Sequence, residues 1–143
     1  MSRAVPGFLL VLTGSRRVGL PLNEVLGVVA LGEVRPVPVI ERAVRGVVSA
    51  HGRMVPLVHL AALLDGGDCP RARTGVGVVV SVHGRRVCLE VDEAEIIVRE
   101  PALPVPPGEA LPWAVGVARH ADQLMPILDL TALSSRLMES ASP

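Results

Sequence analysis

The sequence predicts an all-β fold of two similar five-stranded barrels packed side by side, followed by a short C-terminal helix. Short apolar runs rich in Val recur along the chain with Gly and Pro between them, which is typical of all-β proteins. In addition, residues 112–134 repeat residues 42–64 without a gap, at an offset of 70 residues. The matching pairs are Gly46 and Gly116, Val47 and Val117, Pro56 and Pro126, Leu60 and Leu130, Ala62 and Ala132, and Leu63 and Leu133. One small unit has therefore been duplicated.

The length of the chain indicates that the two copies share a core. The chain has 143 residues, and 50% of them are hydrophobic. A unit of about 70 residues buries too little surface to be stable by itself, whereas a chain of about 150 residues buries roughly 68–70% of the surface that its unfolded form exposes. We therefore predict a single domain over residues 1–143, with a first subdomain at about 8–64, a polar linker at 65–75 and a second subdomain at about 76–138.

The first copy opens with Phe8–Leu12, an apolar run that predicts a buried strand. The turn residues His51 and Gly52 lie between two apolar runs and predict a hairpin. The further expected elements are a half-buried strand at 18–22, a strand at 25–31, the two hairpin strands within 46–60 and a helical turn at 61–64. An extended Pro-bearing stretch at 35–38 precedes the hairpin.

The second copy repeats this order of elements. Val76, Val78, Val80 and Val82 alternate with other residues, so they predict a strand with one continuous apolar face. The further expected elements are strands at 87–91 and 96–98, a Pro-rich extended stretch at 101–112, hairpin strands at 113–117 and 124–128, and a helix at 131–138. The helix is the only one with apolar residues at helical spacing over two turns.

Composition and charge exclude several function classes. The 14 basic residues, all Arg, balance 14 acidic ones, and Phe8 and Trp113 are the only aromatic residues. A nucleic-acid surface needs clustered excess positive charge or stacking aromatics, so we predict no nucleic-acid partner. No apolar run approaches the roughly 20 residues of a membrane span, so we predict no membrane insertion. Cys69 and Cys88 lack motif spacing and predict free thiols in a cytoplasmic protein.

The sequence contains no recognisable catalytic or metal-binding motif. The four His residues have no metal-ligand spacing with Cys or with one another. Asp92, Glu93 and Glu95 form a local acidic cluster, which predicts a solvated strand end more readily than a carboxylate pair. His59 ends an apolar run, so we expect its side chain to be half-buried and hydrogen-bonded. We therefore predict that the protein is not an enzyme, and that it needs no cofactor or metal and acts through protein–protein contacts.

The hairpin carries a resemblance to a known family. Arg45-Gly46-Val47-Val48 and the following segment Gly52–Leu60 resemble the signature of CheW-like domains, the chemotaxis coupling protein family. Gly19–Val25 is similar to the family's second strand, and Gly84–Val87, Val91–Glu93 and Val115–Ala118 are similar to its second barrel. The resemblance covers about residues 8–138 and implies two SH3-like five-stranded barrels.

The resemblance implies a non-enzymatic adaptor in chemosensory signalling and motility. Its expected partners are the cytoplasmic tip of a chemoreceptor, a methyl-accepting chemotaxis protein, and a CheA-type histidine kinase. By position, the expected receptor-binding residues are Val25, Gly27, Val28, Val29 and Val47. The expected kinase-binding or interface residues are Arg45, Ser49, His51 and Arg53.

Three departures from the family pattern indicate a divergent member. Gly27 stands where the family often has Glu, and Ser49-Ala50-His51 stands where it usually has Asn-Leu-Arg. His59 stands where it usually has Asp, although the second copy keeps Asp129. The hypothesis is that one of the two partner contacts is weakened or lost, because charge-assisted hydrogen bonds contribute about 1.5–3 kcal/mol each. A small-barrel nucleic-acid binder and the regulatory domain of a histidine kinase are the alternatives.

Overall fold

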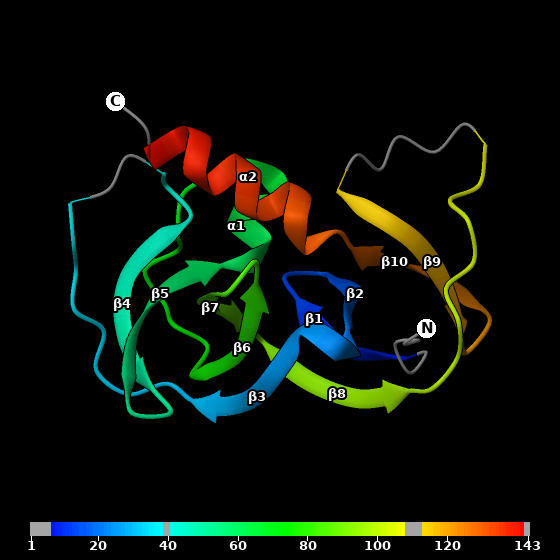
Figure 1. Cartoon of the computed structure of the whole chain (residues 1–143), viewed down its shortest axis with the longest axis horizontal. Helices are drawn as coiled ribbons and strands as arrows, with labels where there is room; N and C mark the ends of the chain where they lie inside the picture. The colour runs from blue at the N-terminus through cyan, green and yellow to red at the C-terminus, as the bar shows by residue number, and fades with distance from the viewer. Residues whose placement is uncertain (1–6, 39–40, 108–112, 142–143) are drawn as a thin grey trace.

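The computed structural model describes residues 7–38, 41–107 and 113–141, and it confirms the mainly β architecture (Figure 1). The described residues form two five-stranded sheets. One sheet contains, in spatial order, β8 (Glu93–Val98), β1 (Phe8–Thr13), β2 (Arg16–Pro21), β10 (Gln123–Leu128) and β9 (Ala114–His120). The other contains β3 (Val25–Ala30), β6 (Val76–Val82), β7 (Arg85–Val91), β5 (Arg53–His59) and β4 (Val44–Ala50). We call them the β1 barrel and the β6 barrel.

The two copies of the repeat exchange strands. The β1 barrel combines β1 and β2 of the first copy with β8, β9 and β10 of the second, and the β6 barrel combines the complementary five strands. The predicted division into subdomains at 8–64 and 76–138 is therefore wrong. Similarity between copies identifies the repeated unit, but it does not report which strand edges pair. The two hairpins β1–β2 and β6–β7 are completed along both edges by strands of the other copy.

The matching Gly and Pro residues of the repeat are explained by how each barrel closes. Arg35, beyond β3, exchanges backbone hydrogen bonds of 2.8 and 2.9 Å with Val47, and Leu103, beyond β8, exchanges two of 2.8 Å with Val117. These bonds bring the crossing chain against a glycine each time. A Cβ on Gly46 would collide with the carbonyl oxygen of Arg35, and one on Gly116 would lie 2.6 Å from that of Leu103.

The matching prolines follow from the same closure. Val47 lies opposite Pro56, and Val117 lies opposite Pro126. Both backbone groups of Val47, the N–H and the carbonyl oxygen, are hydrogen-bonded to Arg35. Val47 therefore forms no hydrogen bond with the residue opposite it at position 56, and the missing N–H of Pro56 leaves no acceptor on Val47 unpaired. The parallel pairing of β5 with β7 starts one residue later, at Leu57. A residue without an N–H is therefore tolerated inside a sheet at this position.

The largest hydrophobic core lies between the two barrels. It draws side chains from both hairpins, namely Leu9, Val11, Val18, Leu20, Val78, Val80, Val82, Leu89 and Val91. Alternate residues point the other way and fill a separate core inside each barrel: Phe8 and Leu10 in the β1 barrel, and Val79 and Cys88 in the β6 barrel. Strands β1, β6 and β7 are thus buried on both faces over most of their length, which is why each contains consecutive apolar residues, as in Phe8–Leu12, Val78–Val80 and Val87–Leu89.

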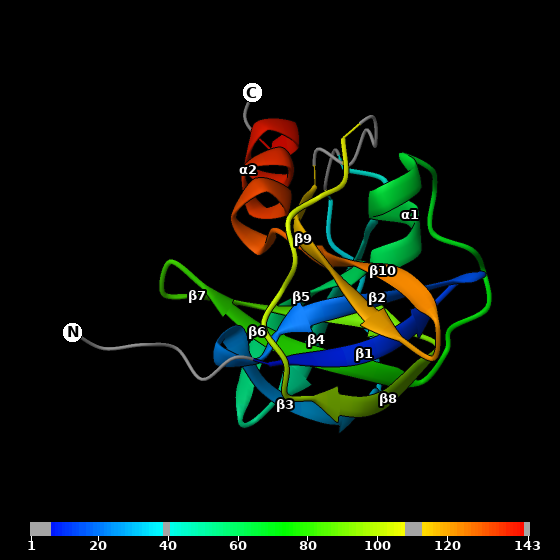
Figure 2. The same ribbon diagram turned by 90° about the vertical axis from the view of Figure 1, so that its right-hand side faces the viewer.

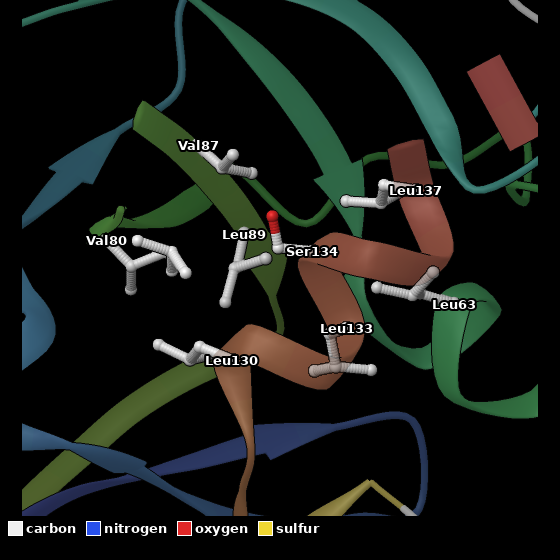
Figure 3. A pocket seen from close by; sticks show the side chains of 9 residues that line it. Leu63, Val80, Val87, Leu89, Leu130, Leu133, Ser134 and Leu137 are labelled. Carbon is white, nitrogen blue, oxygen red and sulfur yellow. The ribbon is translucent and has the colours of Figure 1, made fainter. Parts of the chain in front are cut away.

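Both helices lie on one side of the molecule, above the strands (Figures 1 and 2). The first is α1 (Leu60–Asp65) and the second is α2 (Leu130–Ala141), which confirms the expected C-terminal helix. Although α2 follows a strand of the β1 barrel, it is seated on the β6 barrel. Leu130, Leu133 and Leu137 surround a hollow of about 20 Å³ together with Val80, Val82, Val87 and Leu89 of the β6 barrel and Leu63 of α1 (Figure 3). The Ser134 hydroxyl lies in this otherwise apolar seat.

Replacing Gly46 by Ala tests the closure of the β6 barrel. The added Cβ meets backbone rather than a flexible side chain, so either the Arg35–Val47 bonds or the strand must shift. We expect Gly46→Ala to lower the free energy of unfolding by about 2 kcal/mol or more in urea denaturation. Gly32→Ala is the matched control, because nothing lies within 4 Å of its added Cβ. It should change stability by less than about 0.5 kcal/mol, and equal effects of the two substitutions would contradict the closure.

Candidate partner-binding surfaces

Strand β3 presents one face to solvent and the other to the barrel. Leu26, Val28 and Ala30 are exposed, whereas Val25, Gly27 and Val29 are half-buried. Val25 packs against the shared core, and Val29 packs against the core of the β6 barrel. Of the predicted receptor-binding residues on this strand, only Val28 therefore offers a large exposed side chain. Strand alternation, counted from Val28, is the signal that would have added Leu26.

The hairpin β4–β5 continues this surface. Ser49 and Met54 lie opposite each other and are both exposed, and Met54 was not anticipated. Arg53 is exposed at the start of β5. Val47 is half-buried, and its backbone closes the barrel. The structure thus brings Ser49, Arg53 and Met54 to one end of the β6 barrel.

The exposed ring of His51 lies against Gly27. An added Cβ on Gly27 would lie 2.9 Å from Cε1 and 3.2 Å from Nε2 of the imidazole, so the ring occupies the space that a side chain at position 27 would need. His51 and Gly52 both have positive φ, of 50° and 76°, as a two-residue hairpin turn requires. Two of the departures from the family pattern therefore meet in space.

Arg45 faces inward, in contrast to its predicted role at a partner interface. Its Nε donates to Oε1 of Glu90 at 2.7 Å and its Nη2 donates to Oε2 at 3.4 Å. The side chains are 12% and 0% exposed, respectively. Arg45 also donates to the carbonyl oxygen of Pro70 at 2.7 Å, and the N–H of Thr74 donates to Glu90 Oε2 at 2.9 Å. This buried network fastens the linker 65–75 to β4 and β7.

The acidic cluster noted in the sequence is used for internal contacts. Asp92 Oδ2 accepts the N–H of Gly14 at 2.8 Å, and Glu95 pairs with Arg17 at 2.7 Å. Both contacts tie the β1–β2 hairpin to the start of β8. A hollow of about 470 Å³ opens beside Asp92, lined by Gly14, His59, Pro70, Ala72, Arg73 and Thr74. Its lining brings opposite charges together and contains no nucleophile poised beside a base.

The two cysteines sit in different surroundings. The Cys69 thiol donates to the carbonyl oxygens of Arg42 and Ala43, both at 3.1 Å, and burial raises its pKa. Cys88 is fully buried inside the β6 barrel, and burial, with a further contribution from Glu90, raises its pKa to about 12. Both are therefore protonated near neutral pH, which makes them poor nucleophiles and poor metal ligands. Among the described residues, no group of three or more His, Cys, Asp or Glu side chains could hold a metal ion.

Each barrel exposes an equivalent apolar pair. Val28 on β3 corresponds to Ile97 on β8, since they lie opposite Val78 and Leu9. These two residues hold the same place in the β6–β7 and β1–β2 hairpins, opposite Leu89 and Leu20. Met54 on β5 corresponds to Leu124 on β10. The exposed fractions are 50% and 51% for the first pair and 53% and 52% for the second. The molecule thus carries two repeat-related pairs of exposed apolar residues, one on each barrel, which we call the Val28–Met54 face and the Ile97–Leu124 face.

Comparison with known proteins identifies the architecture. The family model described as a CheW-like domain matches residues 7–138. A solved structure with the same fold is the scaffolding protein TtCheW from Thermoanaerobacter tengcongensis, with a TM-score of 0.76 and 18% identity over 92% of this chain and 89% of that one. No curated protein matches the chain. The predicted fold of two SH3-like barrels is confirmed. No helix in the described part of the chain is long and apolar enough to cross a membrane.

Replacing Arg45 by Leu tests whether it is structural. The substitution leaves the Glu90 carboxylate buried without its counter-ion, so we expect the free energy of unfolding to fall by about 3–5 kcal/mol. Arg16→Leu is the matched control, because it breaks the exposed Arg16–Asp65 pair and should cost about 1 kcal/mol or less. Urea denaturation of both variants measures the difference. A cost for Arg45→Leu as small as that of the control would refute the structural role.

Proposed function

Because the chain belongs to the CheW-like family, we propose that it is a chemosensory coupling adaptor that holds a chemoreceptor's cytoplasmic tip beside a CheA-type histidine kinase. An adaptor of this kind does no chemistry of its own. It works by binding two partners in a fixed relative geometry, so that a change in one partner alters the binding or the orientation of the other.

The observation that carries the proposal is the exposed apolar surface of the β6 barrel, the Val28–Met54 face, together with the β4–β5 hairpin end on the same barrel. Large exposed apolar side chains that gather on one face are typical of protein–protein contact sites. The shared core joins the two barrels through strands buried on both faces. The Val28–Met54 face and the hairpin end of Ser49, His51 and Arg53 are therefore carried by one packed body, so two partners bound there are held in a fixed relative geometry, which is what a bridging protein requires.

We assign the receptor to the Val28–Met54 face. The receptor tip is a helical hairpin, and a helix docks through apolar side chains at regular spacing into a surface of small and aliphatic residues. Leu26, Val28 and Ala30 supply such a surface along β3. On this proposal Val25, Gly27, Val29 and Val47 support the surface from beneath.

We assign the kinase contact to the hairpin end formed by Ser49, His51 and Arg53, and we propose that it is weaker here than in typical family members. With Gly27 and His51 in place of Glu and Arg, an apolar packing contact replaces a possible ion pair. The charged groups that would otherwise face a partner at this end are reduced to Arg53. Losing charged partners at an interface lowers both its affinity and its association rate.

Val28→Arg tests the receptor assignment. A guanidinium in the middle of an apolar contact should weaken binding of a receptor-tip fragment at least about tenfold, equivalent to about 1.4 kcal/mol, in isothermal titration calorimetry. Ile97→Arg is the matched control, since it places the same charge at the equivalent position of the other barrel. It should leave receptor affinity unchanged. The assignment fails if the control weakens binding as much as Val28→Arg does.

The double substitution Gly27→Glu with His51→Arg tests the kinase assignment. It restores the charges of the family pattern at two positions that face each other. We expect affinity for the CheA-type kinase to rise roughly tenfold or more. Gly27→Glu alone should not help, because the new side chain displaces the His51 ring. Calorimetry of both proteins measures the kinase affinity. If the wild-type chain already binds the kinase tightly and the double variant binds it no better, the weakened contact is contradicted.

A further inference from the structure

The two copies of the repeat cap their helices with different side chains. Nδ1 of His59 accepts the backbone N–H of Ala62 at 3.1 Å at the start of α1. At the equivalent place before α2, Oδ1 of Asp129 accepts the backbone N–H of Ala132, also at 3.1 Å. The geometry is the same, but an imidazole and a carboxylate change charge at very different pH values, with ordinary pKa values of about 6.5 and 3.9.

The His59 cap requires a neutral ring. His59 is 9% exposed. Its backbone N–H donates to the carbonyl oxygen of Ala43 at 2.8 Å, which fixes the backbone of His59 at the end of β5. A protonated imidazole donates from both nitrogens, and it would set one N–H against that of Ala62. It would also place a positive charge at a helix N-terminus, where positive charge is unfavourable.

The charges around His59 come from several elements. Burial lowers the pKa of His59, Glu90 on β7 raises it, Arg45 on β4 lowers it and Asp92 raises it, with a net lowering. Glu90 and Asp92 are already engaged, by Arg45 and Thr74 and by the N–H of Gly14 respectively. Arg73 and Thr74 of the linker line the same hollow, and the Cys69 thiol lies near the backbone of His59. On α1 itself, Asp65 is at the far end and pairs with Arg16.

The cap holds a helix on which both barrels depend. Leu60, Ala62, Leu63 and Leu64 of α1 contribute to the shared core, and the linker 65–75 leaves from its end. Loosening the first turn of α1 therefore weakens the packing that fixes the barrels relative to each other.

We propose that the His59–Ala62 hydrogen bond is a proton-sensitive latch, which acidification from neutral to about pH 5 opens while the Asp129–Ala132 cap stays closed. The sign follows from the lowered pKa of His59. Its contribution to stability is fully present above the pKa of the unfolded chain, about 6.5, and is lost as the pH falls through the lower folded value. The inference rests on the fold and not on the identity of any partner.

Amide hydrogen exchange of the full chain at pH 7.5 and pH 5.0, corrected for the intrinsic exchange rate, tests the latch. The protection of the Ala62 amide should fall about fivefold on acidification, while that of Ala132 should not change. In His59→Asn, a side chain that caps without titrating, Ala62 protection should be the same at both pH values. Equal protection of wild-type Ala62 at the two pH values, or the same fall in His59→Asn, would overturn the proposal.

A second measurement needs no variant. The ¹⁵N shifts of the wild-type His59 ring should show Nδ1 unprotonated at pH 7.5 and protonated at pH 5.0. A ring that carries its proton on Nδ1 at neutral pH cannot accept from Ala62, and that result would also overturn the proposal.

Discussion

The structure depends on two hairpins that are buried on both faces. Strands β1, β6 and β7 send alternate side chains into a core of their own barrel and into the core between the barrels. Strand β2 sends Val18 and Leu20 into the shared core, and its Gly19 lies against Phe8 of the barrel core. A strand with two apolar faces has no face to give to solvent, so it must lie between two layers. Packing the two barrels against each other meets this requirement, because one face of each hairpin then lies in its own barrel and the other in the shared core. The barrels cannot separate without exposing the shared core.

This arrangement leaves only certain surfaces free for partners. The inner faces of the hairpins and the seats of both helices are used for packing, and the buried Arg45–Glu90 pair fixes the linker. Val28 with Met54, and Ile97 with Leu124, remain as large exposed apolar residues on outer strands and hairpins. Because the exchange makes the barrels equivalent, these faces are equivalent too. A duplicated fold thus presents two repeat-related pairs of exposed apolar side chains, one on each barrel.

The two copies have diverged where the surrounding structure tolerates it. Gly46 and Gly116 match because backbone crosses both, whereas His51-Gly52 and Ala121-Asp122 differ at exposed hairpin tips. His59 and Asp129 differ in charge but both accept the same helix N–H, so local structure constrains the acceptor and not the residue type. The differences between copies are therefore the places where pH sensitivity and partner preference can differ between the two halves.

The sequence by itself determined the β class, the duplication, the positions of most strands and both helices, and the family, because period-two alternation and turn residues are local signals. Tertiary structure alone decided which strands pair. An apolar strand reads the same whichever neighbour it has, so Val76–Val82 indicated a buried face but not that it packs on Leu9 and Val11 of the other barrel. The same holds for the site. Position in the motif selected Arg45, yet a buried carboxylate 45 residues along the chain turns it inward. Alternation from Val28 is enough to predict that Leu26 is exposed, whereas the exposure of Met54 followed only from the strand pairing.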